Sequence, residues 1–173
     1  MEGTKKNNVD ELVALLDCED PIQCRKARRR LIKIGQEAVP ALAAAASSGL
    51  PMKRWEALAA LGSIGGHDAI QTLISHLGDA DYGIRWTAAD NLIKIGEPAL
   101  TPVLKAMISN SGSLPFRDGA HHFLTGLVSG TSPFNEILDP AIKSLEEPVA
   151  DLKAPVAAES ALDDIRASHK IRG

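Results

Sequence analysis

A phrase of thirteen residues occurs three times in this chain, and its period constrains the fold more than any other feature. The copies cover residues 23–35, 53–65 and 84–96, and each ends in glycine. In every copy an alanine stands eight residues before that glycine, a leucine four before it and an isoleucine one before it. A fixed period of about 30 residues predicts an array of stacked units, none of which can bury its apolar face alone.

The three shared apolar residues predict an α-helix in each copy. Offsets of 0, +4 and +7 place them on one helical stripe, and the glycine that follows is a common helix stop. We call this second helix of each period the inner helix, and the helix that precedes it the outer helix. We expect the stripe to be buried, and its clearest members are Ala57, Leu61, Ile64, Ala88, Leu92 and Ile95.

The sequence therefore predicts an all-α fold, a right-handed α-solenoid of about five helix pairs. We expect one repeat domain over residues 9–168, with a disordered N-terminus at 1–8 and a frayed tail at 169–173. Pro140 should kink or break the ninth helix. The charged fifth pair is predicted to be a terminal cap. The repeats are expected at about residues 9–35, 36–65, 66–96, 97–130 and 131–168.

Composition and charge narrow the possible functions. The net charge is −3, so no bulk attraction to nucleic acid or to an anionic membrane is expected. No apolar run approaches the roughly 20 residues that span a bilayer, and the start lacks the apolar stretch of a secretion signal. We expect a cytoplasmic location and no contact with a membrane. In a reducing compartment Cys18 and Cys24 would remain thiols, although a disulfide across the predicted turn stays open.

No residue pattern points to catalysis, a cofactor or a metal. The chain has no nucleophile elbow, phosphate-binding loop or paired-carboxylate motif. His121 and His122 are adjacent on a predicted helix, so their side chains diverge by about 100° and should not share a metal. We expect no catalytic residue, no cofactor and no metal site.

The residues around the inner helices resemble HEAT repeats. The phrase at 84–96 is similar to the short bacterial type named after the phycobilisome lyases, in which an acidic residue in the turn precedes an arginine that opens the second helix. Asp81 and Arg85 match that pattern, and Arg54 and Arg117 hold the arginine position in their copies. Leu50 departs from it, because it stands where the acidic residue is expected. Pairing of Arg85 with Asp81 or with turn carbonyls is the interpretation that we favour.

Families that share such repeats suggest three further activities. Bilin lyase subunits handle tetrapyrroles, and this chain is short for that group. Deoxyhypusine hydroxylases bind two irons through His-Glu pairs, and no His-Glu dipeptide occurs here. HEAT-like DNA glycosylases use a basic face with tryptophans and an aspartate, for which Trp55, Trp86 and Asp90 would be the counterparts.

In a HEAT-like array the side of the inner helix opposite the core stripe lines a concave groove. Two positions per repeat point there, two residues before and two residues after the stripe alanine. Because exposed tryptophan and arginine are typical of binding hot spots, we predict a partner-binding strip at these positions. The alternative is that each indole lies flat over the neighbouring repeat. The predicted partner-binding residues are Arg25, Arg29, Trp55, Trp86, Asp90, Asp118 and His122.

The leading functional hypothesis is a non-catalytic adaptor that binds a protein partner in this groove. The alternative is a bilin lyase or chromophore-handling subunit, with the two tryptophans flanking a planar ligand. A third hypothesis is weak nucleic-acid binding through the basic first inner helix. Acidic residues precede that helix, so we favour a solvated surface there and do not expect nucleic acid to be the partner.

Overall fold

The structure is a computed structural model that describes residues 2–17, 19–128 and 133–172. Over these residues it contains ten α-helices, two short 3-10 helices and no strand, which confirms the all-α fold class. The chain forms two compact units, residues 1–73 (unit 1) and 74–173 (unit 2), and each has its own packed helices.

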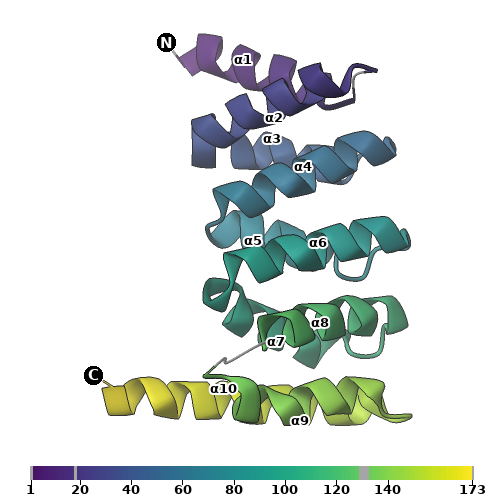
Figure 1. The fold of residues 1–173 in the computed structure, drawn as a ribbon, viewed down its shortest axis with the longest axis vertical. Helices are drawn as coiled ribbons and strands as arrows, with labels where there is room; N and C mark the ends of the chain where they lie inside the picture. The colour runs from purple at the N-terminus through teal and green to yellow at the C-terminus, as the bar shows by residue number, and fades with distance from the viewer. Residues whose placement is uncertain (1, 18, 129–132, 173) are drawn as a thin grey trace. The chain divides into compact units, whose positions relative to one another are not determined.

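Unit 1 contains the first two inner helices. Figure 1 shows α2 beside α4, and these inner helices pack on each other while α3 packs on α4. α1 begins at residue 2, earlier than the start at residue 9 that the apolar pattern indicated. The elements are α1 (Glu2–Ala14), η1 (Leu15–Asp17), α2 (Pro21–Ile34), η2 (Gly35–Ala38), α3 (Val39–Ala46) and α4 (Pro51–Ile64).

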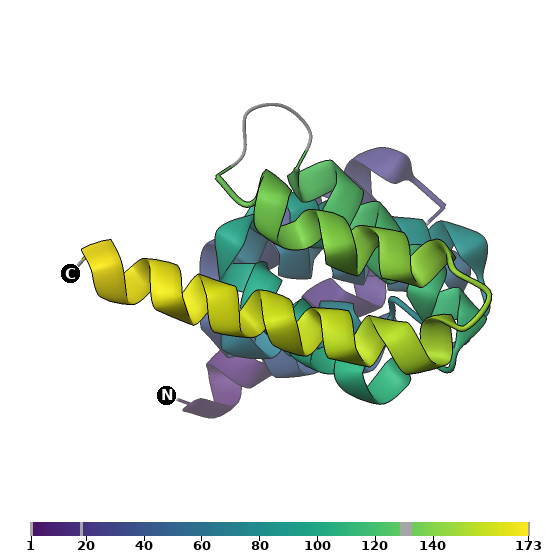
Figure 2. The same ribbon diagram turned by 90° about the horizontal axis from the view of Figure 1, so that it is seen from below.

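Unit 2 contains the later inner helices. α6 packs on α8, and α10 packs on both α7 and α9; Figure 2 shows α9 and α10 side by side. The unit boundary lies inside α5 (His67–Ser75). The remaining elements are α6 (Tyr82–Ile95), α7 (Glu97–Asn110), α8 (Leu114–Leu127), α9 (Asn135–Glu146) and α10 (Ala150–Arg172).

Side-chain caps begin α2, α6 and α8, and glycines end α2, α4 and α6. The Asp20 carboxylate accepts from the backbone N–H of Ile22 at 2.8 Å, which caps the N-terminus of α2. At the other end of that helix Gly35 has a φ of 74°, and Gly65 and Gly96 end their helices at 66° and 76°. Residues other than glycine rarely adopt a backbone φ in this left-handed region, so the repeated glycine is the helix stop that the sequence predicted.

The predicted core stripe is buried except at its last position. Its alanine and leucine members are fully buried: Ala57, Leu61, Ala88 and Leu92 are each 0% exposed. Ile64 and Ile95 are only half-buried, so the prediction that they belong to the core was wrong. Each is the last residue of its helix, and the chain turns away at the next glycine, so no further helical turn covers the side chain.

The C-terminal helices differ from expectation in two respects. α9 runs unbroken through Pro140, so the predicted break does not occur. Pro140 and Glu136 are both exposed, and water can therefore reach the carbonyl that loses its helical donor. The outer face of α10 is not wholly polar, because Leu152 and Val156 are 69% and 66% exposed. In the described ranges no helix is long and apolar enough to cross a membrane.

Candidate functional site

The predicted partner-binding residues fall into two clusters, one in each unit. Unit 1 carries Arg25 and Arg29 on α2 and Trp55 on α4; unit 2 carries Trp86 and Asp90 on α6 and Asp118 and His122 on α8. All seven reach the surface, Trp86 and His122 being half-buried and the others exposed. We call the first cluster the α2–α4 site and the second the α6–α8 site. Whether both line one groove stays a prediction.

Arg28, which the sequence analysis did not select, contacts both Glu56 and Trp55 in the α2–α4 site. Arg28 Nη1 lies 2.7 Å from Oε2 of Glu56, so a charge-assisted hydrogen bond joins α2 to α4. The Glu56 residue is buried, at 4% exposure. The guanidinium carbon of Arg28 also lies 5.6 Å from the ring centroid of Trp55, a cation–π distance. One arginine thus neutralises a buried carboxylate and supports an exposed indole.

An open pocket of about 300 Å³ lies between α2 and α4, beside Trp55. Met52 and Trp55 are exposed by 54% and 43% and give the pocket an apolar surface. Arginines from α2 supply positive charge at its edge. The site can therefore receive an apolar side chain and place an acidic group near the arginines. The lining residues are Glu19, Pro21, Cys24, Arg25, Arg28, Met52, Trp55 and Glu56.

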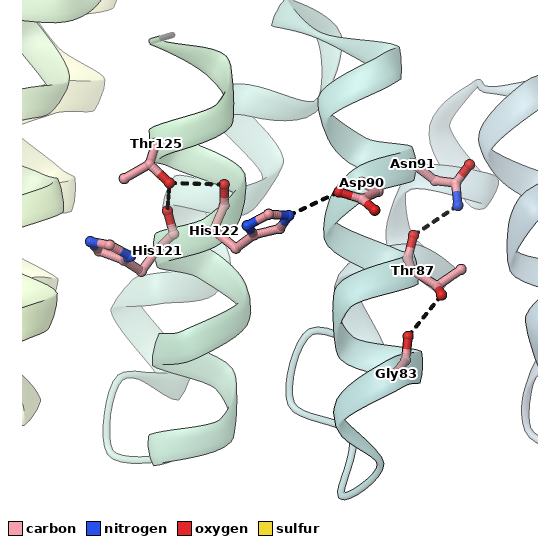
Figure 3. Close-up of polar contacts among 7 residues, drawn as sticks. All are labelled: Gly83, Thr87, Asp90, Asn91, His121, His122 and Thr125. Carbon is pink, nitrogen blue, oxygen red and sulfur yellow. Dashed lines mark hydrogen bonds and ion pairs between the residues drawn. The ribbon is translucent and has the colours of Figure 1, made fainter.

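Three rings stack in the α6–α8 site. The centroids of Tyr82 and Trp86 are 4.8 Å apart with an interplanar angle of 25°. Trp86 in turn stacks on His122 at 3.9 Å and 24°, so this ring column joins α6 to α8. His122 Nε2 lies 2.8 Å from Oδ1 of Asp90, and Figure 3 shows this contact between α8 and α6. The structure thus brings together three of the predicted residues, Trp86, Asp90 and His122.

The two adjacent histidines of α8 face different helices. His121 Nε2 lies 2.8 Å from Glu146 Oε1 on α9, whereas His122 contacts Asp90 on α6. The predicted divergence of the two rings is confirmed. Figure 3 also shows the Thr125 hydroxyl, which donates to the carbonyl of His121 at 2.7 Å. No group of three or more metal-binding side chains occurs in the part of the chain that the structure describes.

The repeated arginines of the inner helices bind carbonyls at the end of the preceding helix or turn. Arg85 Nη1 donates to the carbonyl of Asp79 at 2.7 Å, and Arg117 Nη1 donates to that of Ser111 at 2.7 Å. Arg54 Nε donates to the carbonyl of Ala46 at 3.2 Å. This confirms the turn-carbonyl interpretation and gives these arginines a structural role.

The acidic residues near Arg85 have different partners. The carboxylate of Asp81 accepts from the backbone N–H of Ile84 at 3.2 Å and so caps α6. Asp118, a predicted partner-binding residue, lies 3.9 Å from Arg85 Nη2. Its side chain is 48% exposed, so it remains available at the surface.

Sequence reasoning missed Arg28, Glu56, Met52 and Tyr82. Arg28 and Glu56 stand one residue after and one before the stripe alanine of adjacent repeats, and opposite charges at these flanking positions were the available signal. Tyr82 precedes Trp86 by four residues, the spacing at which side chains meet on a helix. Cys24 is buried. The sequence analysis left a disulfide between Cys24 and Cys18 open, and Cys18 lies outside the described residues.

Comparison with known proteins supports the fold that the geometry shows. A family model described as HEAT repeats matches residues 9–83 and again residues 39–121, which together span more than half of the chain. No curated protein and no solved structure matches the chain. The stacked helix pairs, the glycine stops and this match together place the chain in the HEAT-repeat family.

Proposed function

We propose that this protein is a non-catalytic adaptor that binds a protein partner through the α2–α4 and α6–α8 sites. The observation that carries the proposal is the indole of Trp55, which is 43% exposed and lies under the guanidinium of Arg28. Tryptophan and arginine at a surface are the residues that most often dominate binding energy. Trp86 stands at the same position of the next repeat, which supports a shared use of this position.

The polar groups at both sites also favour binding over catalysis. The Arg28 guanidinium is paired with Glu56, and the His122 imidazole is paired with Asp90. Each pair joins two neighbouring inner helices within its unit and orders the side chains around an indole. Rigid aromatic residues bind with little loss of conformational freedom, which is the property an adaptor surface needs. A cytoplasmic location and a partner other than nucleic acid belong to the same proposal.

Affinity purification with three tagged chains tests this function. The first is the unaltered chain, and the second carries Trp55→Ala and Trp86→Ala. A matched control carries Leu152→Ala and Val156→Ala, which removes exposed apolar groups from α10 instead. We expect a partner that the unaltered chain and the control retain and the tryptophan variant loses, with unchanged helical circular dichroism in all three. Equal recovery by the folded tryptophan variant would contradict the proposal.

A second candidate follows from the ring column of the α6–α8 site. Tyr82 is 59% exposed at one end of the column and could extend the stack over a planar ligand. Such a ligand would have to displace the guanidinium of Arg85, which lies 5.5 Å from the centroid of the Tyr82 ring. The candidate function is that of a chromophore-handling subunit of the phycobilisome-lyase type. Titration with a linear tetrapyrrole, followed by its visible absorbance, tests it. A spectral shift that Tyr82→Ala abolishes would support this candidate, and an unchanged spectrum would remove it.

A further inference from the structure

We propose that the α2–α4 site binds an acidic peptide segment that carries one apolar anchor side chain. The inference rests on the proposed adaptor function and adds the chemistry of the partner. The anchor fills the pocket beside Met52 and Trp55. The acidic side chains of the segment then face Arg25, Arg29 and Lys33 along α2.

The charge on α2 is the first argument. The helix contains six lysines and arginines and no aspartate or glutamate. Arg28 is paired with Glu56, and Arg30 donates to the side-chain oxygen of Asn8 at 3.4 Å. The other four cations, Arg25, Lys26, Arg29 and Lys33, are exposed, and none has an ion pair with a described carboxylate.

Three of these cations form a row along one face. Arg25, Arg29 and Lys33 are spaced four residues apart, so each lies one turn above the last. Like charges at this spacing repel and destabilise a helix. An acidic segment along the row would replace that repulsion with attraction. In the free protein no described carboxylate forms an ion pair with these three cations.

The apolar surface beside the row is the second argument. Met52 and Trp55 border the pocket, and Leu50 just before α4 is also exposed. A ligand that fits both this apolar surface and the basic row beside it must offer an apolar side chain together with negative charge. The pocket of about 300 Å³ accommodates a single large side chain and not an extended apolar face.

The same features favour a peptide over nucleic acid. A phosphate backbone would satisfy the basic row and a base could stack on Trp55, but a nucleic acid has no flexible apolar side chain to fill the pocket beside Met52. Glu19 borders the pocket and Asp20 caps α2, so one end of the site is acidic and repels a uniform polyanion. A peptide can place its anchor at that end and its carboxylates toward Arg29 and Lys33.

One substitution separates binding from folding. Arg29→Glu converts the middle of the row into the opposite charge, so that it attracts both Arg25 and Lys33. The fold should be at least as stable as before, while an acidic ligand is repelled. Lys105→Glu makes the same change of net charge at an exposed position of α7 and serves as the matched control.

The test selects peptides from a random displayed dodecapeptide library on the immobilised full chain. Enriched peptides are synthesised with a fluorophore, and their affinities are measured by anisotropy at physiological salt. We expect acidic sequences with an apolar anchor. Arg29→Glu, Trp55→Ala and replacement of the anchor by alanine should each weaken binding about tenfold or more, whereas Lys105→Glu should leave it within about twofold.

The outcomes distinguish this inference from the adaptor function. Enriched peptides without net negative charge, or peptides that bind Arg29→Glu as tightly as the unaltered chain, overturn the acidic-segment proposal. If such peptides still depend on Trp55, the adaptor function stands. If a short DNA duplex binds more tightly than the best peptide, the ligand of this site is nucleic acid and the peptide proposal is wrong. Failure to enrich any peptide that depends on Trp55 or Trp86 counts against both proposals.

Discussion

Gly119→Ala should destabilise unit 2 through a direct clash between backbones. Gly119 lies in the middle of α8 and faces the turn that follows α5. A Cβ added there would press on the carbonyl oxygen of Leu77 and lie 3.1 Å from both its carbonyl carbon and its Cα. All three are backbone atoms, so no side-chain rotation can relieve the contact, and α8 must move away from the turn.

The expected cost follows from two opposing effects. Alanine in place of glycine in a helix interior contributes about 1 kcal/mol of stability. Overpacking costs about 1–3 kcal/mol, and we expect the upper end because the obstructing atoms belong to the backbone. The free energy of unfolding should therefore fall by about 2 kcal/mol.

Gly126→Ala on the same helix is the matched control. Its added Cβ would meet the side chain of Ile93, with Cγ1 at 2.9 Å, and that side chain can adjust. Urea unfolding should show a clear fall in the midpoint for Gly119→Ala, a smaller change for Gly126→Ala and an unchanged slope for both. A Gly119→Ala chain as stable as the original would refute the close approach of α8, and so would a larger loss at Gly126.

Three further predictions concern the core, the ion pair and nucleic acid. Leu92→Ala should cost about 2–5 kcal/mol in urea unfolding because the side chain is fully buried, and Ile95→Ala should cost less; a loss below about 1 kcal/mol at Leu92 would contradict the buried stripe. Arg28→Met should lower the free energy of unfolding by about 2–3 kcal/mol, which is below the range for fully buried pairs because the Arg28 side chain is 22% exposed. Adding Glu56→Gln should recover part of this loss; no recovery would mean that the unpaired Glu56 carboxylate is not its cause. DNA binding, measured by anisotropy, should be weak and fall steeply with salt, and submicromolar affinity at physiological salt would contradict the peptide proposal.

The repeated phrase predicted the helices well because the same packing recurs in each period. An alanine and a leucine four residues apart must face the core in every copy, and Ala57, Leu61, Ala88 and Leu92 do. The isoleucine of the phrase was harder to place. Its angle on the helix is correct, but burial also depends on what covers the helix end, and a single period of sequence does not contain that information.

The sequence indicated which helix positions carry the candidate residues, and it did not indicate their contacts. Counting angles around the helix correctly put Trp55 at the surface, whereas Trp86 is half-buried because it lies against His122 of the next repeat, which is the alternative that the sequence analysis kept open. It could not show that Arg28 would reach across to Glu56, because that contact depends on the spacing of α2 and α4 and on the rotamer of a long side chain. Nor could it show that Trp86 would stack on His122, because the two residues are 36 positions apart and the contact depends on the distance between their helices.

The central claim is that Trp55 and Trp86 bind a partner protein. The most direct test uses the partner that the unaltered chain captures. Calorimetry measures its affinity for the unaltered chain and for the variant that carries both Trp55→Ala and Trp86→Ala. Because each tryptophan is expected to be a binding hot spot, the account predicts a loss of at least about a hundredfold in affinity with the fold intact. An affinity that stays within about twofold in the folded variant would contradict the claim.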